Sequence, residues 1–313
     1  MYRRILVPLD GSKLAERVLP YARLLAKAQH VPIELLHVFD RLPSVLANSS
    51  GERGADCSST AFRNEANEYK YIEQIASSLR SVGVEVTVAS REGDPASLII
   101  REAAQHSNTL IAMSTHGRSG VGRWVFGSVT DKVLHSNTGY MLIVRATSKE
   151  RRSHSDVKLG AIIVPLDGSD LAEQSLPVAS ALSQSLGIRV SLVTATSTIE
   201  EAMSTISFQE MGVDAGEGIP SSEDIAKKMD GDARGYLDKI REILIQQGVT
   251  SIETQLLHGS AAGAIVDLVQ ETSDNMVVMT THGRSGIGRW VLGSVTDRVV
   301  RESGDPVLVI RPN

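Results

Sequence analysis

A glycine- and arginine-rich segment, residues 114–131, holds the residue types best suited to bind an anion. Its glycines, among them Gly117 and Gly127, let the backbone approach a ligand closely because they carry no side chain. Two arginines add positive charge, and the hydroxyls of Ser128 and Thr130 add hydrogen-bond donors. A helix is expected to start near Ser128, and a helix N-terminus presents free N–H groups with a partial positive charge. Together these groups predict a cradle for phosphates.

A helix cap or a standard nucleotide-binding loop accounts for this segment less well. Ser128 and Asp131 have the spacing of a capping box, but a cap alone does not explain the glycines and arginines before it. A Walker loop is excluded because Ser128 stands where the lysine should be, and a dinucleotide fingerprint is missing after the first strand. His116 and His282 could act as bases, but neither has a carboxylate partner nearby in the sequence. A slow ATPase or phosphotransferase is therefore kept as an alternative to binding alone.

A second segment with capacity for chemistry is Pro8-Leu9-Asp10-Gly11-Ser12, which follows the first apolar run. The carboxylate of Asp10 could accept hydrogen bonds from a ribose hydroxyl or an adenine amine. It could equally cap the turn before the first helix. The residues alone leave both interpretations open.

Both segments occur twice, in the same order. Residues 7–12 recur as residues 164–169, and residues 115–131 recur as residues 281–297 with differences at only two positions. A repeat of this length indicates that a whole domain is duplicated. We expect one domain over residues 1–147 and a second over 159–313, joined by a polar linker over 148–158.

The elements that position these segments follow from hydrophobic periodicity. Short β-branched runs alternate with longer helical patterns, which predicts an α/β fold with a parallel sheet covered on both faces. In such sheets ligands bind beyond the carboxyl ends of the strands, where both repeated segments lie. In the first copy the expected strands are 4–9, 33–39, 84–90, 109–115 and 140–145, and the expected helices are 14–29, 61–82, 95–106 and 129–136.

Two features of these elements stay open. Pro20 falls inside the first expected helix and Pro177 takes the matching place in the second copy, so the helix either starts later or bends there. Two polar stretches, residues 43–60 and 196–232, are expected to be loops, with a lid or a partner surface as the alternative.

Length and composition limit the class of protein. The chain has 313 residues, with 42% hydrophobic and 22% charged content, which is typical of soluble globular proteins with two domains. No apolar run is long enough to cross a membrane, and the net charge of −5 argues against a general nucleic-acid binder. A single cysteine, Cys57, excludes an internal disulfide and a multi-cysteine metal site. The N-terminus does not have the pattern of a secretory signal, so we expect a cytoplasmic protein.

Taken together, these residues resemble the universal stress protein family over nearly the whole chain, twice. ATP-binding members of that family carry Gly-x-x-Gly, nine further residues and then Gly-Ser or Gly-Thr. Here Gly117 and Gly127 match with nine residues between them, while Ser114 replaces the first glycine. In the second copy Gly283 and Gly293 match in the same way, and Thr280 replaces the first glycine.

The resemblance also implies an architecture. It implies two tandem open-sheet Rossmann-like domains, each with a five-stranded parallel sheet of order 3-2-1-4-5 flanked by helices. Family members commonly dimerise through the last strand, so the two copies could pair within one chain, and a homodimer could form. The family's strand-one aspartate falls on Asp10 and Asp167, and its apolar adenine contact falls on Val38 and on the smaller Ala195.

The expected function is that of a stress-response regulator that binds ATP, with Mg²⁺ carried by the nucleotide. We expect no catalytic residue, no protein metal site and no contact with nucleic acid or membrane. We expect the first copy to bind the nucleotide better, because its half of the chain is the more basic. Residues 1–150 hold 18 basic and 15 acidic side chains, and the rest of the chain holds 14 and 22. A scaffold that binds no nucleotide is the remaining alternative, since Ser114 and Thr280 replace motif glycines. The expected nucleotide contacts are Pro8, Asp10, Val38, Ser114, Gly117, Gly127, Ser128, Val129, Thr130, Pro165, Asp167, Ala195, Thr280, Gly283, Gly293, Ser294, Val295 and Thr296.

Overall fold

Two compact units make up the chain, Met1–Val157 and Lys158–Asn313, and each is described by itself. The structure is a computed structural model, and most of the expected linker lies outside the residues that it describes. The described residues are 1–39, 57–116, 127–137, 139–146, 157–196, 221–272, 274–282 and 292–311.

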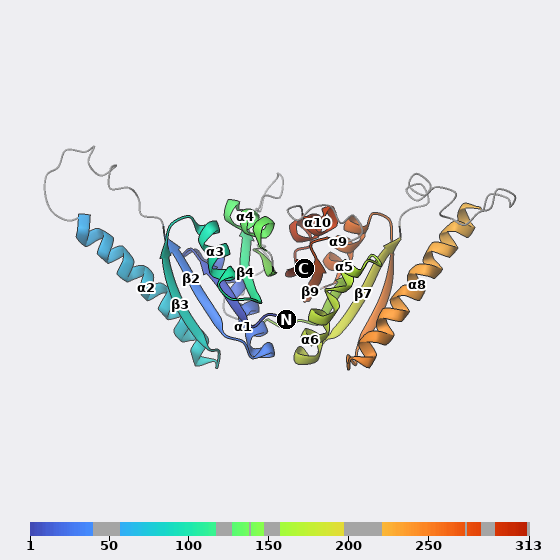
Figure 1. Ribbon diagram of the computed structural model, residues 1–313, viewed down its shortest axis with the longest axis horizontal. Helices are drawn as coiled ribbons and strands as arrows, with labels where there is room; N and C mark the ends of the chain where they lie inside the picture. The colour runs from blue at the N-terminus through green and yellow to red at the C-terminus, as the bar shows by residue number, and fades with distance from the viewer. Residues whose placement is uncertain are drawn as a thin grey trace. The chain divides into compact units, whose positions relative to one another are not determined.

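Strands and helices alternate along the first unit (Figure 1). All neighbouring strands pair in parallel, in the order β3-β2-β1-β4-β5, so the expected order is confirmed in this unit. In register, Ile5 of the first strand lies between Ile33 and Leu110. The elements are β1 (Arg4–Leu9), the 3-10 helix η1 (Ala15–Val18), α1 (Leu19–Gln29), β2 (Ile33–Phe39), α2 (Cys57–Ser81), β3 (Val86–Glu92), α3 (Pro95–Ala104), β4 (Thr109–His116), α4 (Ser128–Ser136) and β5 (Tyr140–Ala146).

The second unit repeats this plan, with strands in the order β8-β7-β6-β9-β10. The ten strands are assigned to one sheet, so the expectation of two separate five-stranded sheets is wrong in that count. The strand at the edge of a sheet has unpaired backbone N–H and C=O groups, to which a further strand can pair. The number of repeated domains in a sequence therefore does not determine the number of sheets. The elements are β6 (Ala161–Pro165), α5 (Asp170–Glu173), α6 (Leu176–Leu186), β7 (Arg189–Thr196), α8 (Ser222–Gln246), β8 (Ile252–His258), α9 (Ala261–Glu271), β9 (Asn275–Thr280), α10 (Ser294–Glu302) and β10 (Val307–Ile310).

Continuous apolar runs explain why these strands lie in the middle of each unit. Ile5, Leu6 and Val7 follow one another in β1 and have no exposed surface. In the second unit β9 is buried along its whole length. A strand whose successive side chains are all buried must be covered on both faces, which is the pattern of parallel sheets.

Helices cover the two faces of the first unit in pairs. Right-handed crossovers place α1 and α2 on one face and α3 and α4 on the other, because the two pairs connect strands in opposite directions along the sheet. The contacts agree with this, since α2 packs on β2 and β3 while α3 packs on α4. The two faces carry different cavities, which are described below.

Proline decides where the first helix begins. The α-helix starts at Leu19, so Pro20 lies in its first turn, where a missing N–H costs no hydrogen bond. The residues before it form η1 instead. Pro177 lies likewise in the first turn of α6. The later start is therefore confirmed, and the alternative of a bend at the proline is wrong.

Two expected loops are shorter than their composition suggests. Helix α2 begins at Cys57, and α8 begins at Ser222, so both helices extend into the polar stretches 43–60 and 196–232. The side-chain oxygen of Ser221 accepts a hydrogen bond from the Asp224 N–H, which caps α8 early. The remainder of both stretches, with the lid or partner surface considered for them, lies outside the described residues.

Strand β3 begins two residues later than its sequence pattern suggests. Gly83, at a φ of 85°, ends α2, and the N–H of Val84 donates to the carbonyl oxygen of Leu79 at 3.2 Å. Val84 is buried under the end of the helix rather than paired in the sheet. An apolar residue that closes a helix has the same local sequence pattern as one that starts a strand.

Candidate functional site

A cavity of about 310 Å³ lies at the carboxyl ends of β1, β2 and β4 in the first unit. The first residues of α3 and α4 form its other side. This is the edge of an open parallel sheet at which ligands bind. The lining residues are Pro8, Leu9, Asp10, Ser12, Leu14, Ala15, Val38, Pro95, Ile99, Met113, Ser114, Gly127, Ser128, Val129 and Thr130.

The second unit has the matching cavity, of about 270 Å³, at the carboxyl ends of β6, β7 and β9. Most of its walls match the first cavity, with Ala195 in place of Val38 and Ala261 in place of Pro95, while His282 lines this cavity alone among the described residues. The lining residues are Pro165, Leu166, Asp167, Ala172, Ala195, Ala261, Ile265, Met279, Thr280, His282, Gly293, Ser294, Val295 and Thr296.

The structure brings together most of the residues that the sequence singled out. Every predicted contact residue that the structure describes lines one of the two cavities. Gly117 and Gly283 lie outside the described residues. Contact of these side chains with a nucleotide remains a prediction.

Sequence reasoning missed part of the apolar wall of each cavity. Pro95 and Ile99 come from α3, and Met113 comes from β4 one residue before the glycine-rich segment. The signal available was positional: the turn after the third strand ends at the same edge of the sheet as the turns after the first and fourth. The other unpredicted lining residues are Leu9, Ser12, Leu14, Ala15, Leu166, Ala172, Ala261, Ile265, Met279 and His282.

Asp10 stabilises the turn after β1. Its Oδ1 accepts a hydrogen bond from the Ser12 N–H at 2.9 Å, and Ser12 Oγ accepts one from the Ala15 N–H at 3.1 Å. Asp167 does the same for Ser169, at 3.0 Å from the N–H and 2.6 Å from Oγ. The turn-capping role is therefore present in both units. The side chain of Asp10 is exposed at the mouth of the cavity, where it can also meet a ligand.

Helix α4 begins at the cavity, and within the described part of the chain no side chain caps its first N–H groups by a hydrogen bond. The N-cap residue is Gly127 and Ser128 is the first helical residue, so the alternative of a capping box at Ser128 and Asp131 does not hold. The cap position depends on backbone conformation, and Gly127 has the extended conformation with φ −60° and ψ 143°. The N–H groups of the first turn are consequently available to an anion.

Close packing explains the glycine at the start of α10. Gly293 donates its N–H to the carbonyl oxygen of Thr281 at 2.8 Å, and an added Cβ would lie 2.8 Å from that same oxygen. Thr296 Oγ1 donates to the carbonyl oxygen of Thr280 at 2.8 Å. These bonds hold the helix N-terminus directly against the end of β9.

The side chains that replace the motif's first glycine are turned to the backbone. Thr280 Oγ1 donates to the carbonyl oxygen of His282 at 2.8 Å. Ser114 Oγ donates to the carbonyl oxygen of Ala15 at the longer distance of 3.4 Å. The Thr280 hydroxyl is thus committed within the protein, whereas that of Ser114 is held more loosely and can turn to a ligand.

An ion pair joins the two helices that line the first cavity. Asp94, the N-cap of α3, accepts hydrogen bonds from the Ser97 N–H at 2.9 Å and from Lys132 Nζ of α4 at 3.1 Å. Hydrogen bonds from Ser97, and then the bond and charge of Lys132, lower the pKa of Asp94 to about 2. The carboxylate is therefore ionised at neutral pH, and it links the N-terminus of α3 to Lys132 of α4 through an exposed ion pair.

The charged groups of the described surface do not form a protein metal site. No group of three or more His, Cys, Asp or Glu among the described residues could hold a metal ion.

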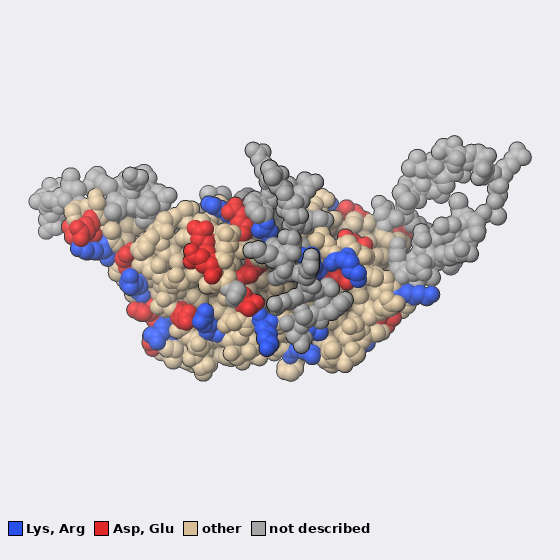
Figure 2. All heavy atoms as spheres, turned by 180° about the vertical axis from the view of Figure 1, so that it is seen from behind, with Lys and Arg blue, Asp and Glu red and all other residues tan. Residues whose placement is uncertain are grey.

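The face seen in Figure 2 mixes basic and acidic side chains over the part of the chain that is described. No helix in the described ranges is long and apolar enough to cross a membrane.

Comparison with known proteins agrees with this architecture. A universal stress protein of Mycolicibacterium smegmatis is 23% identical over 310 residues, which cover 98% of this chain and 97% of that protein. The crystal structure of a universal stress protein from Archaeoglobus fulgidus superposes over the whole of both chains, with a TM-score of 0.72 and 19% identity. A second solved structure, of a universal stress protein in complex with cAMP, covers 47% of this chain and 98% of that chain with 17% identity; its TM-score of 0.36 carries no argument for the fold.

The family assignment rests on a match that covers almost the entire chain. The pattern of the universal stress protein family matches residues 1–145 and again residues 159–311. The two matches correspond to the two units and to the two repeated sets of segments. The chain therefore belongs to the universal stress protein family, as a member with two tandem copies of its domain.

Proposed function

We propose that the chain is a stress-response regulator whose units bind an adenine nucleotide, with ATP as the favoured ligand. The observation that carries the proposal is the N-terminus of α4, which lines the first cavity and has no side-chain cap hydrogen bond from the described residues. The phosphates would lie on the N–H groups of Ser128 and Val129. The base would lie on the apolar wall that includes Val38 and Ile99.

Mg²⁺ would arrive with the nucleotide in this proposal. The donor set of the first cavity supports this view, because Asp10 is the only carboxylate among the described residues that line it and Mg²⁺ usually takes several oxygen ligands. Phosphate oxygens and water would supply the remaining ligands.

Binding is favoured over turnover in the first unit. Hydrolysis requires a base beside the attacking water, and Asp10 is the one ionisable side chain in the described part of this cavity wall. Its Oδ1 is already held by the Ser12 N–H. The second unit differs, because His282 lines its cavity with Nδ1 3.0 Å from Thr281 Oγ1. Slow hydrolysis, if it occurs, is proposed for that unit.

A charge placed at each helix N-terminus tests the proposal unit by unit. Ser128→Glu and Ser294→Glu put a carboxylate beside the amides, which repels phosphate while a negative charge suits the first turn of a helix. Ser107→Glu is the matched control, since this exposed residue precedes β4 at the opposite end of the strand. Titration calorimetry with MgATP, ADP and cAMP would be done on the full chain.

The outcomes separate the candidate functions. We expect Ser128→Glu to weaken MgATP binding at least tenfold, Ser294→Glu to remove a weaker second site, and Ser107→Glu to leave both unchanged. Phosphate release that disappears in Ser294→Glu would instead assign an ATPase to the second unit. A wild-type chain that binds no adenine nucleotide would contradict the proposal and favour a scaffold.

Assembly and location remain proposals as well. Exposed strand edges favour pairing of the two copies within the chain and of two chains with each other. Light scattering of the purified chain measures the second of these. A location in the cytoplasm stays a proposal and is tested by fractionation of the source cells.

A further inference from the structure

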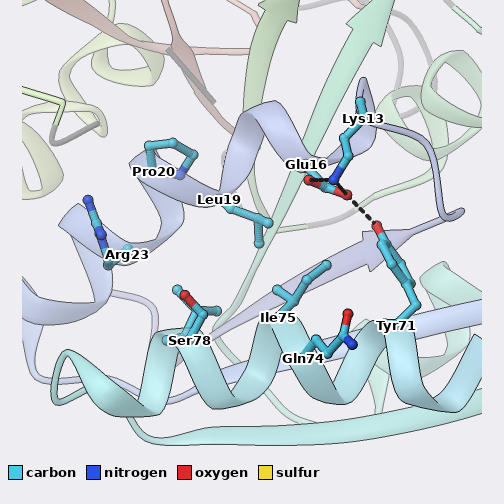
Figure 3. Close-up of a pocket in the computed structure, with 10 residues that line it drawn as sticks. Lys13, Glu16, Leu19, Pro20, Arg23, Tyr71, Gln74, Ile75 and Ser78 are labelled. Carbon is cyan, nitrogen blue, oxygen red and sulfur yellow. Dashed lines mark hydrogen bonds and ion pairs between the residues drawn. The ribbon is translucent and has the colours of Figure 1, made fainter. Parts of the chain in front are cut away.

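One short segment of the first unit lies between two cavities. Ser12, Leu14 and Ala15 line the cavity at the strand ends, which is the proposed nucleotide site. Lys13 and Glu16 line a different cavity of about 350 Å³, between α1 and α2 (Figure 3). Five consecutive residues therefore meet the nucleotide site on one side and the groove between the two helices on the other.

A hydrogen bond from Tyr71 joins this segment to α2. Tyr71 Oη donates to Glu16 Oε1 at 3.1 Å, and Lys13 Nζ donates to the two oxygens of the same carboxylate at 3.0 and 2.9 Å (Figure 3). The side chain of Glu16 is only 4% exposed, so water can hardly replace a donor that is lost. A movement of Glu16 is consequently costly unless Tyr71 follows it, which ties the position of the segment to that of α2.

The charge at the nucleotide site also reaches Tyr71. Burial of the phenol, the charge and hydrogen bond of Glu16, and then the charge of Asp10 raise the pKa of Tyr71 well above its usual range. The phenol therefore stays protonated and remains a donor at neutral pH. Asp10 lines the strand-end cavity, so a charge change there acts on the same phenol that holds Glu16.

The second unit contains the same connection in different surroundings. Ala172 lines its strand-end cavity, and the next residue, Glu173, accepts a hydrogen bond from Tyr236 Oη of α8 at 3.1 Å. By the repeat, Asp170 stands where the first unit has Lys13, so the neighbouring charge is reversed. The tyrosine–glutamate bond is thus present in both units although its surroundings differ, which indicates that it does not serve the lysine.

We propose that the hydrogen bond between Tyr71 and Glu16 couples the nucleotide site of the first unit to α2, with Tyr71 as a positioning residue. This inference rests on the proposed function. The bond holds the wall at Ser12 and Ala15 in its place before the ligand arrives, so less ordering of the wall accompanies binding. Coupling is reciprocal, and a nucleotide that fixes this wall therefore also fixes Glu16 and, through it, α2.

Titration calorimetry with MgATP on full-length chains measures one side of the coupling, in the Ser294→Glu background that leaves the first site. We expect Tyr71→Phe to weaken MgATP binding on the order of fivefold to tenfold. Two controls should leave it unchanged: Tyr69→Phe, a tyrosine of α2 that is 59% exposed, and Tyr236→Phe, which removes the same bond from the other unit.

The outcomes distinguish the coupling from the function on which it rests. A wild-type chain that binds no MgATP would overturn both. A wild-type chain that binds MgATP, together with a Tyr71→Phe chain that binds it as tightly as Tyr69→Phe does, would overturn the coupling alone.

Hydrogen–deuterium exchange measures the other side and separates coupling from a general loss of stability. In the wild type, saturating MgATP should slow exchange both at the start of α4 and in residues 71–79 of α2. In Tyr71→Phe, at a MgATP concentration that restores saturation, the protection of α4 should remain and that of α2 should be lost. A chain that is merely less stable would keep both. No protection of α2 in the wild type, or protection that persists in Tyr71→Phe, would overturn the proposal.

A double substitution tests the route through Glu16. In a Glu16→Leu chain the acceptor is absent, so adding Tyr71→Phe should not change MgATP binding further, whatever Glu16→Leu does by itself. If Tyr71→Phe weakens binding as much in the Glu16→Leu chain as in the wild type, the tyrosine acts through another contact and the proposal is wrong.

Discussion

Replacing Gly293 with alanine measures how closely α10 must approach the end of β9. The Cβ of the alanine would lie 2.8 Å from the carbonyl oxygen of Thr281, where ordinary contact begins at 3.4 Å. The backbone at this residue has φ −59° and ψ 143°, which any residue adopts. The cost of the substitution is therefore steric and does not come from the backbone conformation.

The magnitude follows from what must move. Relief of the contact requires a shift of roughly 0.6 Å between the helix N-terminus and the strand end. That shift lengthens the 2.8 Å hydrogen bond from the Gly293 N–H to the same oxygen. Loss of a hydrogen bond costs about 1 kcal/mol and overpacking about 1–3 kcal/mol, so we expect a destabilisation of about 2–4 kcal/mol.

Urea unfolding of the full chain, followed by circular dichroism, is the assay. Gly235→Ala is the control, because this glycine lies inside α8 and an added Cβ would meet nothing within 4 Å. Alanine there should raise stability by about 0.5–1 kcal/mol, so the two substitutions are predicted to have opposite signs. A Gly293→Ala chain as stable as wild type would refute the steric reasoning.

Three further perturbations have predicted signs. Tyr71→Phe removes a donor from the buried carboxylate of Glu16 and should lower the free energy of unfolding by about 1–3 kcal/mol in urea titrations; an unchanged midpoint would contradict this. Tyr2→Phe should raise it by about 1 kcal/mol, because Tyr2 Oη is buried without a hydrogen-bond partner among the described residues, and a loss of stability would count against that assignment. Asp94 contributes stability that is fully present above its ordinary pKa of 3.8 and is lost as the pH falls to about 2. Thermal unfolding of Asp94→Asn should therefore depend less on pH in that window than wild type, and an equal dependence would exclude the role.

The site and the fold could be predicted to different depths. The internal repeat singled out the two segments that contain Asp10 and Gly127. Both follow strands of a parallel sheet, so they could be predicted to lie at the same edge of that sheet, where the first cavity is found. The alternative of a capping box at Ser128 does not hold, because the cap position depends on the backbone conformation of a single residue, which the sequence pattern does not determine. The apolar wall from α3 was missed because Pro95 and Ile99 resemble ordinary core residues.

By itself, the sequence determined that the chain holds a duplicated α/β domain, and it located the glycine-rich turns. Hydrophobic periodicity and sequence repeats can be recognised in the sequence alone, because neither depends on how the side chains pack. The contact between Glu16 and Tyr71 depends on packing, and so does the burial of Leu176 and Ile240, whose counterparts Leu19 and Ile75 stay partly exposed. The reason is that burial of a side chain depends on how two helices turn toward each other, and that rotation is set by contacts between residues far apart in the chain.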